Sequence, residues 1–456
     1  MILREERVCN TLENNTLCAG FPFRFADIWE NPLADRRRLA DFWEDHLFGH
    51  ILPFWEKYAF DELGGINTML RDDGQVLGTD KWLWGQFRAI WVFSKIYNTL
   101  DPDPRWLKYA QHIYRFAITH GWDEAGDGWA LCLSREGKII SGAESIYTDA
   151  FALCGLTELA RALGVKDGEI ADQVKKTADA VICKLKWPHD RIPHAPYPVP
   201  AGARVHGIPM LFSQTFGEVG FYWGDEDYLK LSRRLTAEVF ETFYRPDRDC
   251  LIERIAEDGG EMPAPLGTAV VPGHVIEDMW FQLQLEENYG STRYVEQAVH
   301  LIQRHLELGW DPVCDGLFLA VDADGSADVG WNSPMVKLWW PQTEALQALT
   351  HVPESLCGAW VSEWYTKLFH LSMNSFCNWA AGEWYQRLSR DLVPFDGPVV
   401  FPVKDPFHLT RSVIMQILNL RESGEEKIRT GRPTGVEHVR VGCGLADPDL
   451  FSTLSR

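Results

Sequence analysis

The stretch Asp123-Glu-Ala-Gly-Asp-Gly128, followed by Arg135-Glu-Gly137, decides the fold of this chain. Gly and Asp at these spacings are typical of tight turns, so the stretch predicts a short β-hairpin with a second turn behind it. Helix-like segments lie on both sides of it, over residues 103–120 and 145–164. The local pattern is therefore helix, hairpin, helix.

This pattern recurs along the chain at intervals of about 60 to 70 residues, which indicates an internal repeat. Further hairpin-like stretches are Asp61–Gly65, Asp247–Asp249, Asp311–Gly316 and Ala381–Glu383. One double interval places a degenerate copy near the Pro- and His-rich residues 188–200. Six units with two helices each predict twelve helices, over 34–59, 79–100, 103–120, 145–164, 167–186, 204–221, 225–242, 271–288, 292–308, 333–349, 352–376 and 406–421.

Two antiparallel helices can bury their apolar faces only against neighbouring units, and six such units can close into a ring. We therefore predict an all-α fold, an (α/α)6 barrel with short β-hairpins on one face and the even-numbered helices inside. A linear solenoid of helical hairpins is the alternative, but solenoids usually lack such regular hairpins. The domain prediction is an N-terminal extension (1–30), a single catalytic barrel domain (31–421) and a flexible C-terminal tail (422–456).

Composition excludes several classes of partner. The formal net charge of −21 repels phosphate backbones and anionic lipid surfaces, so we expect neither nucleic-acid nor membrane binding. The ten cysteines show no metal-ligand spacing, which predicts reduced thiols and no metal site. No N-terminal segment has the pattern of a signal peptide, and no stretch approaches about 18 apolar residues. These features predict a soluble cytoplasmic protein.

A histidine after a helix-breaking pair is the first candidate for chemistry. Pro272 and Gly273 precede an apolar run at helical spacing, so His274 lies in the first turn of a helix and Glu277 follows on the same face. A carboxylate there can accept the N–H of one ring nitrogen and leave the other as a base near neutral pH. A helix-capping histidine on an ordinary surface is the alternative.

The predicted topology turns the N-terminal ends of all six even-numbered helices toward one cavity. The polar and aromatic residues at these ends are Trp84, Arg88, Trp91, Tyr147, Asp149, His206, His274, Glu277, Lys337, Trp339, Glu344, His408 and Arg411. Each has a structural alternative. Arg88 could be a buried ion-pair partner, Tyr147 and Asp149 could cap their helix, and Glu344 could bond to Lys337 or Arg88.

His408 follows a Pro-Phe break as His274 follows Pro-Gly, so two histidines occupy equivalent places in different repeats. Two imidazoles across a pocket suit the transfer of a proton on a carbon next to a carbonyl. Arg88 beside the carbonyl oxygen would stabilise the enolate charge, and tryptophans offer flat apolar faces to a sugar ring. This chemistry requires no metal.

Several ordered motifs carry a resemblance over roughly residues 35–421. They are Arg88–Trp91, Ser145–Phe151, Pro272–Glu277, Lys337–Glu344, Gly382–Tyr385 and Phe407–Arg411. In these the chain resembles the N-acylglucosamine 2-epimerase family. The resemblance implies an (α/α)6 barrel that interconverts sugars at carbon 2 through an open-chain enediolate. It also implies ATP as an effector that is not consumed, no required cofactor, and a homodimer as a possible assembly.

The resemblance assigns roles to individual residues. It implies that His274 and His408 are the acid/base pair, that Arg88 is the cation beside the carbonyl, and that Glu344 is a catalytic or substrate-positioning carboxylate. Glu277 would orient His274.

We therefore predict an epimerase, an isomerase of carbohydrate metabolism that converts N-acylglucosamine into N-acylmannosamine. An aldose–ketose isomerase of the mannose isomerase type, or a cellobiose 2-epimerase, is the nearest alternative. A glycoside hydrolase using Glu344 and Asp149, or a binding protein without catalysis, is less favoured.

Overall fold

The structure, a computed structural model, describes residues 20–395, 404 and 406–422. The predicted tail, apart from Glu422, lies outside the described residues, as do residues 1–19 of the predicted N-terminal extension. All twelve predicted helical segments are present. The first is α1 (Arg36–His46) continued by a π-helical turn and α2 (Leu52–Tyr58), and the others are α3 (Leu83–Thr99), α4 (Pro104–His120), α5 (Ile146–Leu163), α6 (Glu169–Lys184), α7 (Gly207–Trp223), α8 (Glu226–Glu238), α9 (Pro272–Tyr289), α10 (Val295–Gly309), α11 (Trp339–His351), α12 (Ala359–Leu371) and α13 (His408–Arg421).

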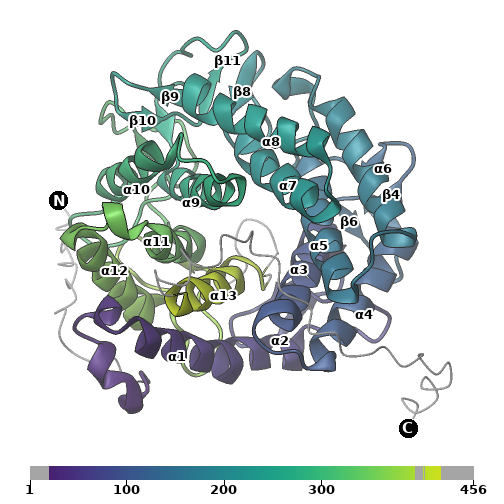
Figure 1. Cartoon of the computed structure of the whole chain (residues 1–456), viewed down its shortest axis with the longest axis horizontal. Helices are drawn as coiled ribbons and strands as arrows, with labels where there is room; N and C mark the ends of the chain where they lie inside the picture. The colour runs from purple at the N-terminus through teal and green to yellow at the C-terminus, as the bar shows by residue number, and fades with distance from the viewer. Residues whose placement is uncertain (1–19, 396–403, 405, 423–456) are drawn as a thin grey trace, which may run out of the picture. The chain divides into compact units, whose positions relative to one another are not determined.

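The helices form two concentric rings (Figure 1). Helices α3, α5, α7, α9, α11 and α13 make the inner ring, in which each helix packs against the next and α13 packs back against α3. Helices α4, α6, α8, α10 and α12 lie outside them, and α1 and α2 complete the outer ring. The predicted (α/α)6 barrel is therefore confirmed.

Burial explains which helices lie inside. On the inner helix α5 every residue from Thr148 to Ala160 is buried, whereas the outer helix α4 buries one face only. A helix that is buried all round needs neighbours on every side, and an amphipathic helix needs one apolar partner.

Inner helices α5, α7 and α9 end at Gly164, Gly224 and Gly290, each with a positive φ that glycine adopts without strain.

Short strands connect the repeats at the N-terminal ends of the inner helices. The strands are β1 (Met69–Leu70), β2 (Val76–Gly78), β3 (Lys81–Trp82), β4 (Trp122–Asp123), β5 (Gly128–Trp129), β6 (Cys132–Leu133), β7 (Ile139–Ser141), β8 (Ala203–Val205), β9 (Tyr244–Arg245), β10 (Cys250–Leu251), β11 (Arg254–Ala256), β12 (Ala269–Val270), β13 (Val321–Asp322), β14 (Lys337–Leu338) and β15 (Arg387–Leu388). A strand that precedes one inner helix pairs with a strand from the next repeat, as in β3–β6, β8–β11, β12–β13 and β14–β15. All pairs are antiparallel.

The predicted hairpins are antiparallel contacts in the structure. Two are the strand pairs β4–β5 and β9–β10, and three are single bridges, Phe60 to Ile66, Trp310 to Leu317 and Cys377 to Trp384. The degenerate copy at 188–200 has a short 3-10 helix (His189–Arg191) and one bridge, Ser145 to His194, in place of a hairpin.

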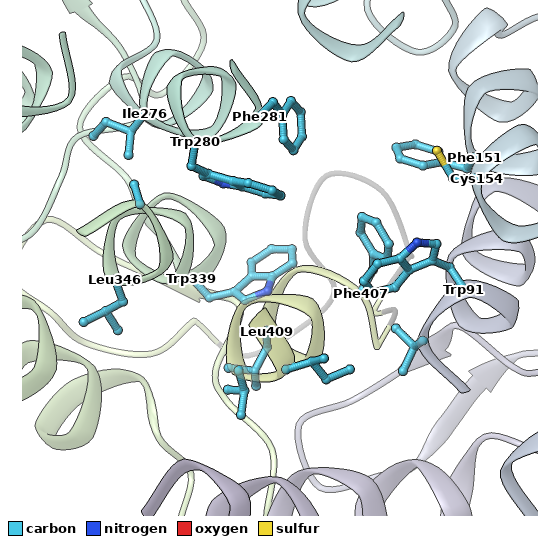
Figure 2. Close-up of a cluster of buried hydrophobic side chains, with 14 of the residues drawn as sticks. Trp91, Phe151, Cys154, Ile276, Trp280, Phe281, Trp339, Leu346, Phe407 and Leu409 are labelled. Atoms are coloured by element: carbon cyan, nitrogen blue, oxygen red, sulfur yellow. The ribbon is translucent and has the colours of Figure 1, made fainter. Parts of the chain in front are cut away.

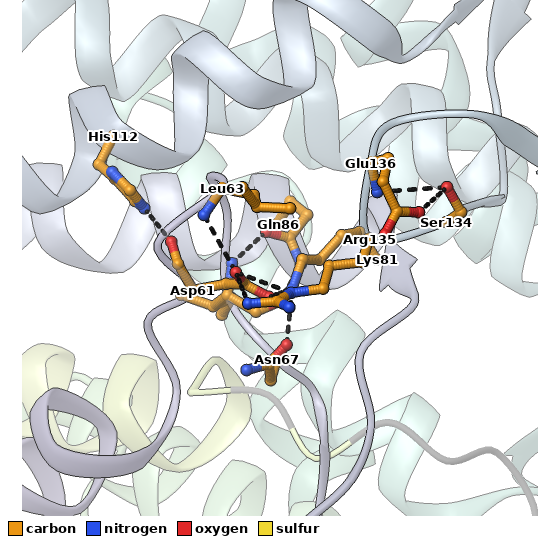
Figure 3. A network of polar contacts seen from close by, with 10 residues as sticks. Asp61, Leu63, Asn67, Lys81, Gln86, His112, Ser134, Arg135 and Glu136 are labelled. Atoms are coloured by element: carbon orange, nitrogen blue, oxygen red, sulfur yellow. Dashed lines mark hydrogen bonds and ion pairs between the residues drawn. The ribbon is translucent and has the colours of Figure 1, made fainter.

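A buried aspartate anchors the hairpin to the inner helix in two repeats. Asp61 accepts bonds from Lys81 Nζ at 2.8 Å and from Arg135 Nε at 2.9 Å (Figure 3). Asp311 does the same with Lys337 Nζ at 3.1 Å and Arg390 Nε at 2.8 Å. Because both lysines come directly before an inner helix, these ion pairs fix where the helix starts relative to its hairpin.

None of the helices in the described ranges is long and apolar enough to cross a membrane. Six of the cysteines in these ranges are free thiols, as predicted. Cys314 is disulfide-bonded, so the prediction of reduced thiols does not hold for this residue.

Candidate active site

His274 lies in the first turn of α9 and is held by a carboxylate from another repeat. Its Nδ1 is 3.2 Å from Oε2 of Glu253, which stands between β10 and β11. The backbone of Glu253 is fixed on both sides, because its N–H donates to Ala269 and its carbonyl accepts from His206. The prediction that Glu277 orients His274 is therefore wrong, since Glu253 holds this place.

His408 is the first residue of α13 and has partners on both ring nitrogens. Its Nδ1 is 2.8 Å from Oε1 of Glu344, and its Nε2 is 3.5 Å from Nη2 of Arg88. Its side chain is 12% exposed and that of His274 is 32% exposed, so both rings keep an accessible edge.

Trp340 brings the two histidines together. The ring of His274 stacks on this indole at a centroid distance of 5.1 Å and an interplanar angle of 29°. The ring of His408 lies 5.8 Å from the same indole and is tilted by 38°. Two imidazoles from separate repeats therefore contact one tryptophan.

Arg411 neutralises two buried carboxylates next to His408. One nitrogen, Nη2, bonds to Glu277 and, at 2.8 Å, to Glu344. Trp280 Nε1 donates to the other oxygen of Glu344 at 2.9 Å. Glu277, Glu344 and His408 also offer ligand atoms within 4.8 Å of one another, the spacing of a metal site. The guanidinium of Arg411 already supplies a cation to both carboxylates, so this donor set does not need a metal for charge balance.

The environment shifts the pKa values of these groups in opposite directions. Burial lowers the pKa of His274, but the charge and hydrogen bond of Glu253 outweigh it, and the net pKa lies above the usual value for histidine. Burial raises the pKa of Glu253, and the charge of His274 brings it below its usual value. Burial also raises the pKa of Glu344, against the lowering effect of Arg411.

Aromatic rings surround the guanidinium of Arg88. Its Cζ is 3.9 Å from the centroid of Phe151, 5.0 Å from Phe407 and 5.5 Å from Trp84. Trp91 packs on Phe407 at 5.5 Å.

The aromatic side chains that Figure 2 labels come from the inner helices α3, α5, α9 and α11 and from Phe407, the residue before α13. The figure shows Trp91, Phe151, Trp280, Trp339 and Phe407 around the middle of the inner ring. Arg88 is thus a cation held in an apolar wall next to His408, where its charge is weakly screened.

The structure does not bring three predicted residues to the two histidines. Asp149 accepts from Lys184 at 2.8 Å, Lys337 is fully buried against Asp311, and His206 is fully buried against Asp278 at 2.7 Å. None of these three partners was among the alternatives considered from the sequence, which were a helix cap for Asp149 and a bond to Glu344 for Lys337. These contacts occur because the ends of inner helices also need anchors to the hairpins.

Tyr147 lies on the His274 side of the site. Its ring packs edge-on against His194 at 5.7 Å. Burial and the charge of Glu253 raise the pKa of its hydroxyl. Glu253 and Trp340 are the residues at the histidines that the sequence-based selection missed. The available signal for Glu253 was a carboxylate within a short apolar stretch, since Leu251, Ile252 and Ile255 flank it.

Fold and side chains together define an (α/α)6-barrel enzyme with a paired-histidine centre. The N-acylglucosamine 2-epimerase family matches residues 64–412, and the chain belongs to it. N-acylglucosamine 2-epimerase of Bos taurus is 26% identical over 393 residues, covering 82% of this chain and 90% of that protein. Cellobiose 2-epimerase of Dictyoglomus turgidum is 23% identical over 395 residues, covering 80% and 94%.

A solved structure shares the fold. A sugar epimerase from a ruminal bacterium superimposes with a TM-score of 0.72 at 20% identity, covering 83% of this chain and 98% of that one. The family consists of carbohydrate epimerases and isomerases, and this chain is one of these enzymes.

Proposed function

We propose that the protein inverts carbon 2 of N-acylglucosamine and N-acylmannosamine. The observation that carries the proposal is the pair His274 and His408 on the shared indole of Trp340. A sugar carbon over this indole has one imidazole available to remove its proton and another to return it. The family and the relatives named above support this substrate class.

The reaction starts from the open-chain sugar, whose carbon 1 is an aldehyde. One histidine takes the proton from carbon 2, the C–H electron pair forms a double bond between carbons 1 and 2, and the carbonyl pair moves onto oxygen. Arg88 stabilises this oxyanion. The second histidine, protonated, delivers its proton to the opposite face of carbon 2, and the carbonyl forms again.

The carboxylates prepare the two rings for this exchange. Glu253 accepts from Nδ1 of His274 and leaves Nε2 as the working nitrogen. Glu344 likewise accepts from Nδ1 of His408, whose working nitrogen is Nε2, 3.5 Å from Nη2 of Arg88. Arg411 keeps Glu344 in place by bonding to it and to Glu277. The proton-transfer groups are thus oriented before substrate binds.

A panel of free sugars in deuterated water, followed by proton NMR, tests the proposal. N-acetylglucosamine should gain deuterium at carbon 2 and give N-acetylmannosamine. Conversion of mannose into fructose would instead indicate an aldose–ketose isomerase. Epimerisation of cellobiose alone would indicate a cellobiose 2-epimerase. A reducing sugar released from a glycoside would favour a hydrolase.

The same panel tests the cofactor predictions. The panel is run with and without ATP, because the family resemblance implies that ATP is an effector that is not consumed. It is also run after treatment of the protein with EDTA, which should leave the epimerisation rate unchanged. The homodimer and the cytoplasmic location stay predictions. Light scattering after gel filtration tests whether the protein is a homodimer.

A further inference from the structure

Three of the hairpins place an equivalent residue beside the start of an inner helix. In each case the residue lies directly before a strand. Its backbone carbonyl accepts a hydrogen bond from a backbone N–H at the start of an inner helix, and that helix belongs to the preceding repeat. The pairs are Leu131 with Leu83 at 3.1 Å, Glu253 with His206 at 3.0 Å and Gln386 with Trp339 at 3.2 Å. Leu131, Glu253 and Gln386 therefore hold the same position in their repeats.

Glu253 shows what this position can reach. Its side chain extends to His274 on the next inner helix, α9. For Gln386 the next inner helix is α13, which begins with His408. Glu344 already occupies Nδ1 of His408 at 2.8 Å, so the side chain of Gln386 is not needed to orient that ring.

Gln386 has a buried amide nitrogen that makes no hydrogen bond within the described part of the chain. This nitrogen is Nε2, and the residue as a whole is 6% exposed. A buried donor left unsatisfied is costly, so such groups call for an explanation. Trp339, whose N–H bonds to the Gln386 carbonyl, packs edge-on against His408 at 6.1 Å. By its equivalence to Glu253, which reaches the next inner helix, Gln386 is placed to reach α13, the helix that begins with His408.

We propose that Gln386 is a substrate-binding residue whose Nε2 donates to an acceptor oxygen of the sugar near the reacting carbon. The inference rests on the proposed function, which puts carbon 2 between His274 and His408. The acceptor is either the acyl carbonyl on nitrogen 2 or a hydroxyl of the chain. Gln386 is the donor that selects a sugar with oxygen at this position.

The test compares Gln386→Leu with Gln303→Leu, the same change on the outer helix α10, where the amide makes an exposed contact with Glu307. KM and kcat are measured for N-acetylmannosamine, and Kd is measured for N-acetylglucosamine and for glucose. Loss of one buried hydrogen bond to substrate should raise KM and Kd about tenfold for Gln386→Leu, with kcat changed much less. Gln303→Leu should match the wild type.

Thermal unfolding of the free protein separates this role from a structural one. Leucine removes an unsatisfied buried donor, so the Tm of Gln386→Leu should equal or exceed that of the wild type. A rise in Kd for N-acetylglucosamine alone assigns the contact to the acyl carbonyl, and an equal rise for glucose assigns it to a hydroxyl.

Unchanged KM and Kd, or a lowered Tm, would overturn the assignment of Gln386 while leaving the proposed function in place. A wild-type protein that neither binds nor converts any of these sugars would overturn both.

Discussion

Replacing Arg411 by methionine should destabilise the protein strongly. The side chain of Arg411 is 6% exposed and bonds to Glu277 and Glu344, whose side chains are 7% and 0% exposed. Methionine has a similar length but no charge, so it leaves two carboxylates in the barrel without their cation. Removing one partner of a buried ion pair costs about 3–5 kcal/mol, because the remaining charge stays desolvated.

Urea unfolding at 25 °C measures this effect as a shift of the transition midpoint at constant m-value. The matched control is Arg421→Met, which removes an ion pair with Glu44 at the surface. The side chain of Arg421 is 39% exposed and that of Glu44 is 36% exposed. Such surface pairs contribute at most about 1 kcal/mol.

Adding Glu277→Gln to Arg411→Met should recover part of the loss, because one buried charge disappears with the cation. The loss should also shrink between pH 8 and pH 5. Without Arg411, Glu344 loses the cation that lowers its pKa against the effect of burial, so its folded-state pKa lies further above the unfolded value and protonation at low pH relieves the penalty. An Arg411→Met variant as stable as the control would refute this reasoning.

Three further predictions concern the remaining parts of the site. Glu253→Gln removes the carboxylate that raises the pKa of His274. In the reaction direction in which His274 is the base, the acid limb of the pH profile of kcat/KM should therefore move to lower pH. An acid limb that does not move would show that Glu253 does not set the pKa of His274. Arg88→Lys should lower kcat by about 10²-fold, because a point charge replaces the planar donor at the oxyanion, and steady-state kinetics check it. Asp149→Asn should lower the Tm but leave kcat within about twofold, because its partner is Lys184; a large loss of kcat would return Asp149 to the site.

The sequence predicted the ring of helices because its evidence is periodic. Each Gly- and Asp-rich turn marks one repeat, and a helix that is apolar all round can only lie inside. The two histidines could be placed together for the same reason, since Pro272 and Pro406 each precede their histidine by two residues at the start of an even-numbered helical segment.

Partners from different repeats could not be predicted in this way. Helical spacing suggested Glu277 for His274, but Glu253, which lies 21 residues earlier between β10 and β11, holds that ring. Lys337 looked like a pocket residue because it precedes a helix, yet its charge is used by Asp311 in the hairpin. Which partner a side chain meets in another repeat depends on the direction of the side chains at the strand ends. The spacing of residues along the sequence does not predict that direction.

Exchange of the carbon-2 proton in single-histidine variants tests the central claim most directly. In deuterated water, His274→Asn and His408→Asn should both lose epimerisation. Each should still exchange the carbon-2 proton of one epimer, and the two variants should act on opposite epimers, because each retains one base on one face. Exchange of the same epimer by both variants, or epimerisation near the wild-type rate by either, would contradict a proton transfer shared by His274 and His408.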